Sequence, residues 1–138
     1  MRTVFWEQGE VVVIDQRRLP QTLEYKRCSD YLQVAAAIKD MLVRGAPAIG
    51  ATAAYGMALA ASQYCGLDRQ EFLLKMEEAS KVLSATRPTA VNLFWALKEI
   101  ERVIEQNIDK EPGEICRVVL DTAEKIAGDD IETNRKIG

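Results

Sequence analysis

The amino-acid sequence predicts a helix-dominant α+β fold, in which a small N-terminal antiparallel β-sheet precedes a bundle of about five helices. Three observations support this prediction. Short β-branched and aromatic runs lie near the N-terminus, apolar residues recur at helical spacing from residue 31 onward, and glycine or proline interrupts the chain between the helical stretches. We expect a single domain over residues 1–138, with the sheet in 1–28 and the helical bundle in 29–138.

The sheet is expected to contain three short strands. The first two, at 4–6 and 11–15, flank the run Gln8-Gly9-Glu10, which is typical of a hairpin turn because Gly9 adopts positive φ without strain. A third strand is expected within 22–28, where apolar and polar residues alternate. A sheet of this size is not stable alone, so we expect it to pack on helices.

The helices are bounded by recognisable start and stop residues. Ser29 or Asp30 is the expected N-cap of the first helix, Asp68 caps the third, and Glu111-Pro112-Gly113 is expected to separate the last two. The expected helices cover residues 31–43, 46–64, 68–85, 91–106 and a last segment that starts near 114. In that last segment, the residues expected to face inward are Ile115, Val118, Val119, Thr122 and Ile126.

The second helix is rich in alanine and glycine. Gly50, Ala54 and Ala58 are four residues apart, which predicts a flat face that lets neighbouring helices approach closely. Residues 45–67 carry no charge and are long enough to span a bilayer, but they lack the leucine, isoleucine and phenylalanine that drive insertion. The pattern favours a buried helix of a soluble protein and no membrane span.

Composition excludes several classes of function. The net charge is −3, which argues against broad nucleic-acid binding. The N-terminal residues lack an apolar signal-peptide core, so a cytoplasmic location is expected. Because the chain has no histidine, it contains no Ser-His or Cys-His catalytic pair. Its three cysteines, Cys28, Cys65 and Cys116, form no metal-binding pair and are expected to be buried thiols, and we expect no metal and no cofactor.

The stretch from Arg44 to Gly50 combines a cation, a flexible glycine and a helix start. Pro47 fits a first helical turn, so the free N–H groups and the positive end of the helix dipole are expected to face Arg44. This arrangement suits an anion, above all a phosphate. A tight helix–helix turn with a surface arginine explains the same residues, and the pattern alone favours that simpler interpretation.

Arg87-Pro88 gives a similar arrangement, an arginine and a proline just before the helix expected at 91–106. Proline holds the preceding arginine extended, and Thr86 and Thr89 provide hydroxyls that suit a helix cap or an anion. Arg44 and Arg87 are each expected in a short, conformationally restricted loop before a helix. The two arginines are well placed to bind one phosphate if these loops converge, and spacing alone does not establish that they do. Taken singly, each arginine is more often a solvated or capping residue.

Several runs together resemble the N-terminal part of the methylthioribose-1-phosphate isomerase family. They are Val13-Ile14-Asp15-Gln16-Arg17-Arg18-Leu19-Pro20, Val43-Arg44-Gly45-Ala46-Pro47-Ala48-Ile49-Gly50, Thr86-Arg87-Pro88-Thr89-Ala90-Val91-Asn92-Leu93 and the closing residues 130–138. The resemblance extends over essentially the whole chain. The same larger group contains the α, β and δ subunits of translation initiation factor 2B and the ribose-1,5-bisphosphate isomerases.

The resemblance implies an aldose–ketose isomerase of methionine salvage, which converts 5-methylthioribose 1-phosphate to 5-methylthioribulose 1-phosphate as a homodimer. By position, Arg44, Gly45 and Ala46 match the family's substrate-binding loop, and Arg87 matches its second substrate arginine. The family's catalytic cysteine and aspartate belong to a C-terminal Rossmann-like domain that has no counterpart here. We therefore expect no catalytic residue among these 138 and an inactive isolated chain.

Two alternatives remain open on the sequence. The first is a non-catalytic regulatory or scaffold domain related to the initiation-factor subunits, which acts through protein contacts. The second is the ribose-1,5-bisphosphate isomerase branch, which shares the sugar-phosphate chemistry but takes another sugar.

Overall fold

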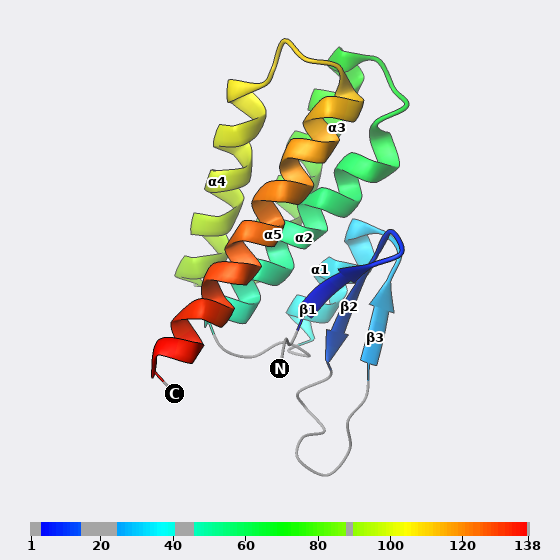
Figure 1. Cartoon of the computed structure of the whole chain (residues 1–138). Coiled ribbons are helices and arrows are strands. Elements are labelled where there is room, and N and C mark those ends of the chain that lie inside the picture. The colour runs from blue at the N-terminus through cyan, green and yellow to red at the C-terminus, as the bar shows by residue number, and fades with distance from the viewer. Residues whose placement is uncertain (1–3, 15–24, 41–45, 88–89, 138) are drawn as a thin grey trace.

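The structure is a computed structural model that describes residues 4–14, 25–40, 46–87 and 90–137, with the side chains of 46–47 and 129–137 left undescribed. The described residues form three strands and five helices (Figure 1). They are β1 (Val4–Glu7), β2 (Glu10–Ile14), β3 (Tyr25–Cys28), α1 (Tyr31–Lys39), α2 (Ala46–Tyr64), α3 (Arg69–Ser84), α4 (Val91–Gln106) and α5 (Pro112–Ile137). The predicted fold class, a small antiparallel sheet followed by a helical bundle, is confirmed.

The sheet is an antiparallel meander in the order β1-β2-β3. β1 and β2 pair with Glu7 opposite Glu10, so Gln8 and Gly9 form a two-residue turn. Both turn residues have positive φ, 53° at Gln8 and 76° at Gly9, as a type I′ hairpin requires. The prediction of positive φ at Gly9 is confirmed, and Gln8 shares that conformation although glutamine has a Cβ.

One face of the sheet packs on α1 and α2. Val11 and Val13 of β2 are fully buried on this face, and the indole of Trp6 stacks on the ring of Tyr55 with 6.4 Å between the ring centroids. Arg27 lies on the opposite, exposed face of β3, where its guanidinium donates to Glu7 and Glu10 at 3.0 Å each. The sheet therefore buries one face on helices, as its small size requires.

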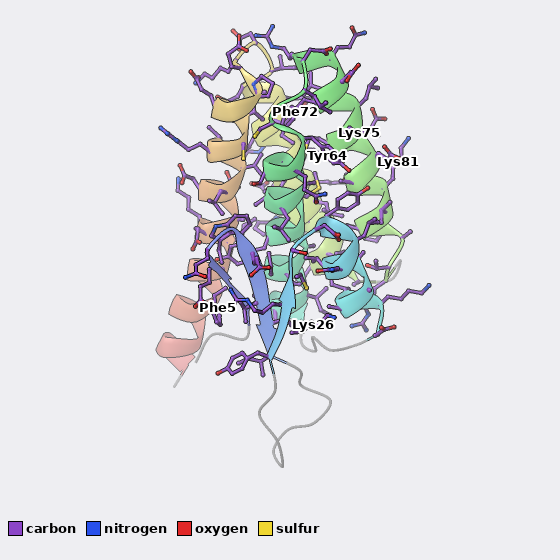
Figure 2. The ribbon with its side chains drawn as sticks, turned by 90° about the vertical axis from the view of Figure 1, so that its right-hand side faces the viewer. Phe5, Lys26, Tyr64, Phe72, Lys75 and Lys81 are labelled. Carbon is purple, nitrogen blue, oxygen red and sulfur yellow. The ribbon has the colours of Figure 1, made fainter. Side chains whose placement is uncertain are left out.

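Helix α2 is the centre of the bundle, with every residue from 48 to 61 buried. It contacts all four other helices and the first two strands, and Figure 2 shows it running through the middle of the molecule. The predicted buried helix is thus confirmed. No described helix combines the length and apolarity that crossing a bilayer needs.

The two glycines inside α2 lie at close contacts between helices. An ideal Cβ on Gly56 would come within 3.0 Å of the Val34 side chain of α1 and 3.2 Å of Leu83 of α3. One on Gly50 would come within 3.0 Å of the Asn92 carbonyl oxygen of α4. Glycine costs about 1 kcal/mol of helix propensity relative to alanine, and this close packing is what offsets the cost.

The predicted boundaries of α2 and α4 coincide with the observed ones, whereas α5 starts earlier than expected. The residue run Glu111-Pro112-Gly113 was expected to break the chain, yet Pro112 is the first residue of α5. Proline is well suited to this position because the first helical N–H needs no partner and the ring fixes a helical φ. Asp30 caps α1 by accepting from the Gln33 N–H at 2.8 Å, and Asp68 caps α3 through the Glu71 N–H at 2.9 Å.

The inward face of α5 also differs from the expectation. Its fully buried positions are four residues apart, at Ile115, Val119, Ala123 and Ala127. Three residues expected inside, Val118, Thr122 and Ile126, are only half-buried at the edge of that face. Because α5 packs closely along the alanine-rich surface of α2, small residues occupy the contact and larger ones flank it.

Candidate anion-binding site

Two of the five described helices, α2 and α4, begin at the same end of the bundle (Figure 1). α3 and α5 begin at the opposite end, so the four long helices alternate in direction along the chain. The positive ends of the α2 and α4 dipoles therefore lie on one side of the molecule.

The starts of these two helices are in direct contact. Gly50, the fifth residue of α2, lies against the backbone of Asn92, the second residue of α4, with 3.0 Å between an ideal Gly50 Cβ and the Asn92 oxygen. Side chains would hold the two backbones farther apart, so glycine at position 50 permits this approach. The contact places the starts of α2 and α4 side by side, and a helix leaves the N–H groups of its first turn without an intrahelical partner.

Among the described residues, no side chain caps the start of α4. Its N-cap is Ala90, whose methyl group cannot accept a hydrogen bond, whereas aspartates cap α1 and α3. Ala90 therefore leaves the first N–H groups of α4 without a side-chain cap, and an anion is the ligand that a helix N-terminus favours.

Arg87 lies in the connection between α3 and α4 and is half-buried. Its carbonyl oxygen accepts from the Ala90 N–H at 3.0 Å, which forms a turn that leads into α4. The hydroxyl of Thr86 donates to the Leu83 carbonyl oxygen at 2.6 Å, so it caps the end of α3 and not the start of α4. Thr89, the second hydroxyl considered, lies outside the described residues.

The predicted site residues are therefore described in part. Ala46 is the first residue of α2, and Arg87 stands four residues before α4, so both belong to the end where the two helix starts meet. Arg44 and Gly45 lie outside the described residues, as does the cluster Asp15-Gln16-Arg17-Arg18. The Gly50–Asn92 contact brings the starts of α2 and α4 together, and the convergence of Arg44 with Arg87 stays a prediction.

A pocket of ≈ 370 Å³ lies elsewhere, between α2, α3 and α4. Four apolar residues and three carboxylates line it: Met57, Leu73, Met76, Ile104, Glu77, Glu101 and Glu105. Carboxylates repel an anion and none of these lining residues is basic, so this pocket does not suit a phosphate. The helix starts remain the better candidate.

The cysteines differ in their exposure. Cys28 is buried, as expected, and burial raises its thiol pKa to about 11. Cys65 is exposed and Cys116 is half-buried, so the expectation of three buried thiols is wrong for these two. Within the described residues, no group of three or more cysteines and carboxylates is placed to hold a metal ion.

Known proteins resemble this chain over nearly its whole length. The model of the initiation factor 2 subunit family matches residues 42–138. The methylthioribose-1-phosphate isomerase of Petrotoga mobilis is 48% identical over 138 residues, which span 99% of this chain and 40% of the relative. That of Desulforamulus reducens is 44% identical, over 100% of this chain and 40% of the relative.

Solved structures show the same fold. The crystal structure of 5-methylthioribose 1-phosphate isomerase from Pyrococcus horikoshii matches with a TM-score of 0.91 and 45% identity, over 95% of this chain and 37% of that one. The translation initiation factor eIF-2B subunit delta of A. fulgidus matches with a TM-score of 0.88 and 39% identity, over 96% of this chain and 38% of that one. The chain thus spans about 40% of the length of the curated relatives it matches.

Proposed function

Because the chain belongs to the initiation factor 2 subunit family and is similar to methylthioribose-1-phosphate isomerases, we propose that it is the substrate-binding part of such an isomerase. The reaction converts the aldose 5-methylthioribose 1-phosphate to the ketose 5-methylthioribulose 1-phosphate. The chain acts as one domain, whose sheet (1–28) and helical bundle (29–138) form a single unit.

The contact between the starts of α2 and α4 is the observation that carries this proposal. Two helix N-termini side by side provide several backbone N–H donors and two aligned dipoles for one phosphate. Arg87 adds a guanidinium from the α3–α4 connection, and Arg44 with Gly45 and Ala46 adds the loop that precedes α2. In this scheme the four residues bind the phosphate of the sugar and do not themselves transfer a proton.

Binding of the phosphate orients the sugar for the isomerisation. The phosphate on C1 of the sugar prevents the simple ring opening that ordinary aldose isomerases use, so the reacting carbons must be presented to an acid–base pair away from water. Binding energy from a non-reacting phosphate is well suited to hold the sugar in that orientation. We expect the 138-residue chain, which spans about 40% of its relatives, to bind the sugar phosphate without isomerising it.

Ligand titration of the 138-residue chain tests the proposal. 5-Methylthioribose 1-phosphate is expected to raise the melting temperature progressively as its concentration increases above the dissociation constant, whereas unphosphorylated 5-methylthioribose is expected to leave it unchanged. Ribose 1,5-bisphosphate serves as the comparison sugar, and a stronger effect of that sugar would assign the chain to the second isomerase branch. Turnover by the isolated chain would contradict the assignment of the chemistry to other residues.

A scaffold domain is the competing function, and the match to the A. fulgidus initiation-factor subunit favours it specifically. Such a domain acts through protein contacts and has no need of a sugar phosphate. The absence of any shift with either sugar phosphate, together with co-purification of a stoichiometric protein partner, would select this function over the isomerase.

We also propose that the whole protein is a cytoplasmic homodimer that binds neither nucleic acid nor a membrane. One face of α4 supports self-association, because Val91, Phe94 and Trp95 lie one helical turn apart and are 77%, 37% and 53% exposed. Light scattering of the purified protein tests this, with replacement of Trp95 by glutamate expected to shift the mass toward the monomer.

A further inference from the structure

Two cysteines from different helices meet at the end of the bundle opposite the candidate anion-binding site. Cys65 directly follows α2, and Cys116 is the fifth residue of α5. The two helices run antiparallel and pack along their length, so the end of one lies beside the start of the other (Figure 1). There Cys65 and Cys116 are close enough that burial and the Cys65 thiol together raise the pKa of the Cys116 thiol.

Separate contacts hold the same two segments together. Arg69, the first residue of α3, donates from Nε to the Lys110 carbonyl oxygen at 3.0 Å and from Nη2 to the Asp109 carbonyl oxygen at 2.8 Å. Its Nη2 also lies 3.6 Å from the Glu111 carboxylate. Arg69 therefore links the segment that follows Cys65 to the segment that precedes Cys116. These hydrogen bonds restrict the relative motion of the two segments that carry the thiols.

The neighbouring aromatic residue is also fixed. Tyr64, which precedes Cys65, lies with Phe72 and Lys75 in the upper part of the molecule in Figure 2. The Lys75 ammonium lies 5.8 Å from the centroid of the Tyr64 ring, within the range of a cation–π contact. The end of α2 thus has contacts on both sides of the cysteine.

The two thiols differ in access to solvent. Cys65 is exposed, and its thiol donates to the Ser62 carbonyl oxygen at 3.5 Å. Cys116 is half-buried, and burial raises the pKa of its thiol, which slows its direct reaction with oxidants. An oxidant from solution therefore reaches Cys65 first and finds a second thiol next to it.

We propose that Cys65 and Cys116 form a redox modification site, in which a peroxide closes a disulfide bond between the end of α2 and the start of α5. The Cys65 thiolate attacks one peroxide oxygen, the O–O bond breaks, and a sulfenic acid forms with release of water. The Cys116 thiolate then attacks the sulfenic sulfur, the S–S bond forms, and hydroxide leaves as a second water with the thiol proton. Two thiols lose two electrons and two protons, and hydrogen peroxide is reduced to two waters.

The bond links positions 65 and 116, so it restricts the unfolded chain strongly. It closes at the opposite end of the bundle from the starts of α2 and α4, and we expect the oxidised protein to retain the geometry of that end. Oxidation is therefore expected to stabilise the bundle, and a small thiol such as glutathione is expected to reverse it.

Peptide mapping after treatment with hydrogen peroxide tests the proposal. We treat the 138-residue chain with a small excess of peroxide, block remaining thiols with iodoacetamide, and digest without reduction. The expected product is a cross-linked peptide pair that contains Cys65 and Cys116, two hydrogens lighter than the separate peptides. The melting temperature is expected to rise by roughly 5 °C or more, and dithiothreitol is expected to abolish both changes.

Cys65→Ser and Cys116→Ser are the matched variants, and each is expected to lose the cross-link and the rise in melting temperature. Cys28, which is buried on β3, is the internal control and is expected to stay reduced. Oxidation that stops at a sulfinic acid on Cys65 while Cys116 is alkylated would overturn the proposal. So would a disulfide between two copies of the chain, or a lower melting temperature of the cross-linked protein.

Discussion

Gly50 of α2 lies against the main chain of Asn92 in α4, with 3.0 Å from an ideal Cβ on Gly50 to the Asn92 carbonyl oxygen. The neighbour is backbone in the first turn of a helix, and backbone gives way less readily than the tip of a side chain. This relationship places the starts of two helices side by side, and it makes position 50 a sensitive probe of the candidate site.

Replacing Gly50 with alanine is expected to lower the free energy of unfolding by about 1 kcal/mol, because the clash with Asn92 outweighs the better helix propensity of alanine. Gly113→Ala is the matched control, since Gly113 lies in the first turn of α5 with open space around its missing Cβ. That change is expected to be neutral or stabilising by up to about 1 kcal/mol. Urea unfolding measures both, and equal effects of the two substitutions would contradict the close contact.

Gly50→Ala is also expected to weaken sugar-phosphate binding, since it separates the helix starts that the phosphate bridges. The measurement is calorimetric titration with 5-methylthioribose 1-phosphate at a temperature where the variant is fully folded. If the variant loses stability but retains its affinity, the phosphate does not depend on the distance between α2 and α4.

Arg87→Ala is expected to lower the affinity for 5-methylthioribose 1-phosphate by roughly tenfold or more, because a hydrogen-bonded ion pair with phosphate is lost. Arg87→Lys keeps the positive charge but lacks the planar guanidinium that donates two parallel hydrogen bonds to a phosphate. This variant is expected to recover part of that affinity. Arg102→Ala is the control, because Arg102 is an exposed residue of α4 that pairs with Glu99. Titration of all three variants decides the matter, and an unchanged affinity in Arg87→Ala would remove Arg87 from the site.

The sequence predicted the ends of those helices whose first and last residues are set by capping or helix-breaking residues nearby in the chain. The bounds of α2 and α4 follow from glycine, proline and threonine at their ends, and the Asp68 cap was identified because aspartate is an efficient N-cap. Pro112 was misjudged because proline both ends helices and begins them, and only the following residues distinguish the two cases.

The parts that the sequence did not predict depend on how helices pack. The buried face of α5 uses Ala123 and Ala127 because α2 approaches closely there, and no pattern within α5 contains that information. The meeting of the α2 and α4 starts likewise follows from the directions of separate helices. Two arginines before two helices were visible in the sequence, whereas the contact between those helices was not.

The β1–β2 turn offers a test of backbone strain. Gln8 has a φ of 53°, a conformation that asparagine and glycine adopt more readily than glutamine. Gln8→Gly is therefore expected to be neutral or stabilising by up to about 1 kcal/mol, whereas Gly9→Val, at a φ of 76°, is expected to destabilise by at least about 1 kcal/mol. Urea unfolding checks both, and a loss of stability in Gln8→Gly equal to that in Gly9→Val would contradict the type I′ turn.

Cys28 makes the stability depend on pH in the alkaline range. Burial raises the pKa of its thiol to about 11 from an ordinary value of 9.0, because a charged thiolate is poorly solvated beneath the sheet. Between these two pH values the unfolded chain has already lost this proton while the folded protein retains it. The folded state then binds more protons, so the free energy of unfolding falls as pH rises from about 9 to about 11.

Cys28→Ala is expected to be less stable than the parent at pH 7, because it leaves a small cavity, but to lose less stability on going to pH 11. The difference between the two pH profiles is expected to be on the order of 1 kcal/mol, and it isolates Cys28 from the tyrosines and lysines that titrate in the same range. Urea unfolding at several pH values, with a reductant present, gives both profiles. Parallel profiles would mean that the Cys28 thiol ionises as readily in the folded protein as in the unfolded chain, and hence that β3 does not hold it in an apolar environment.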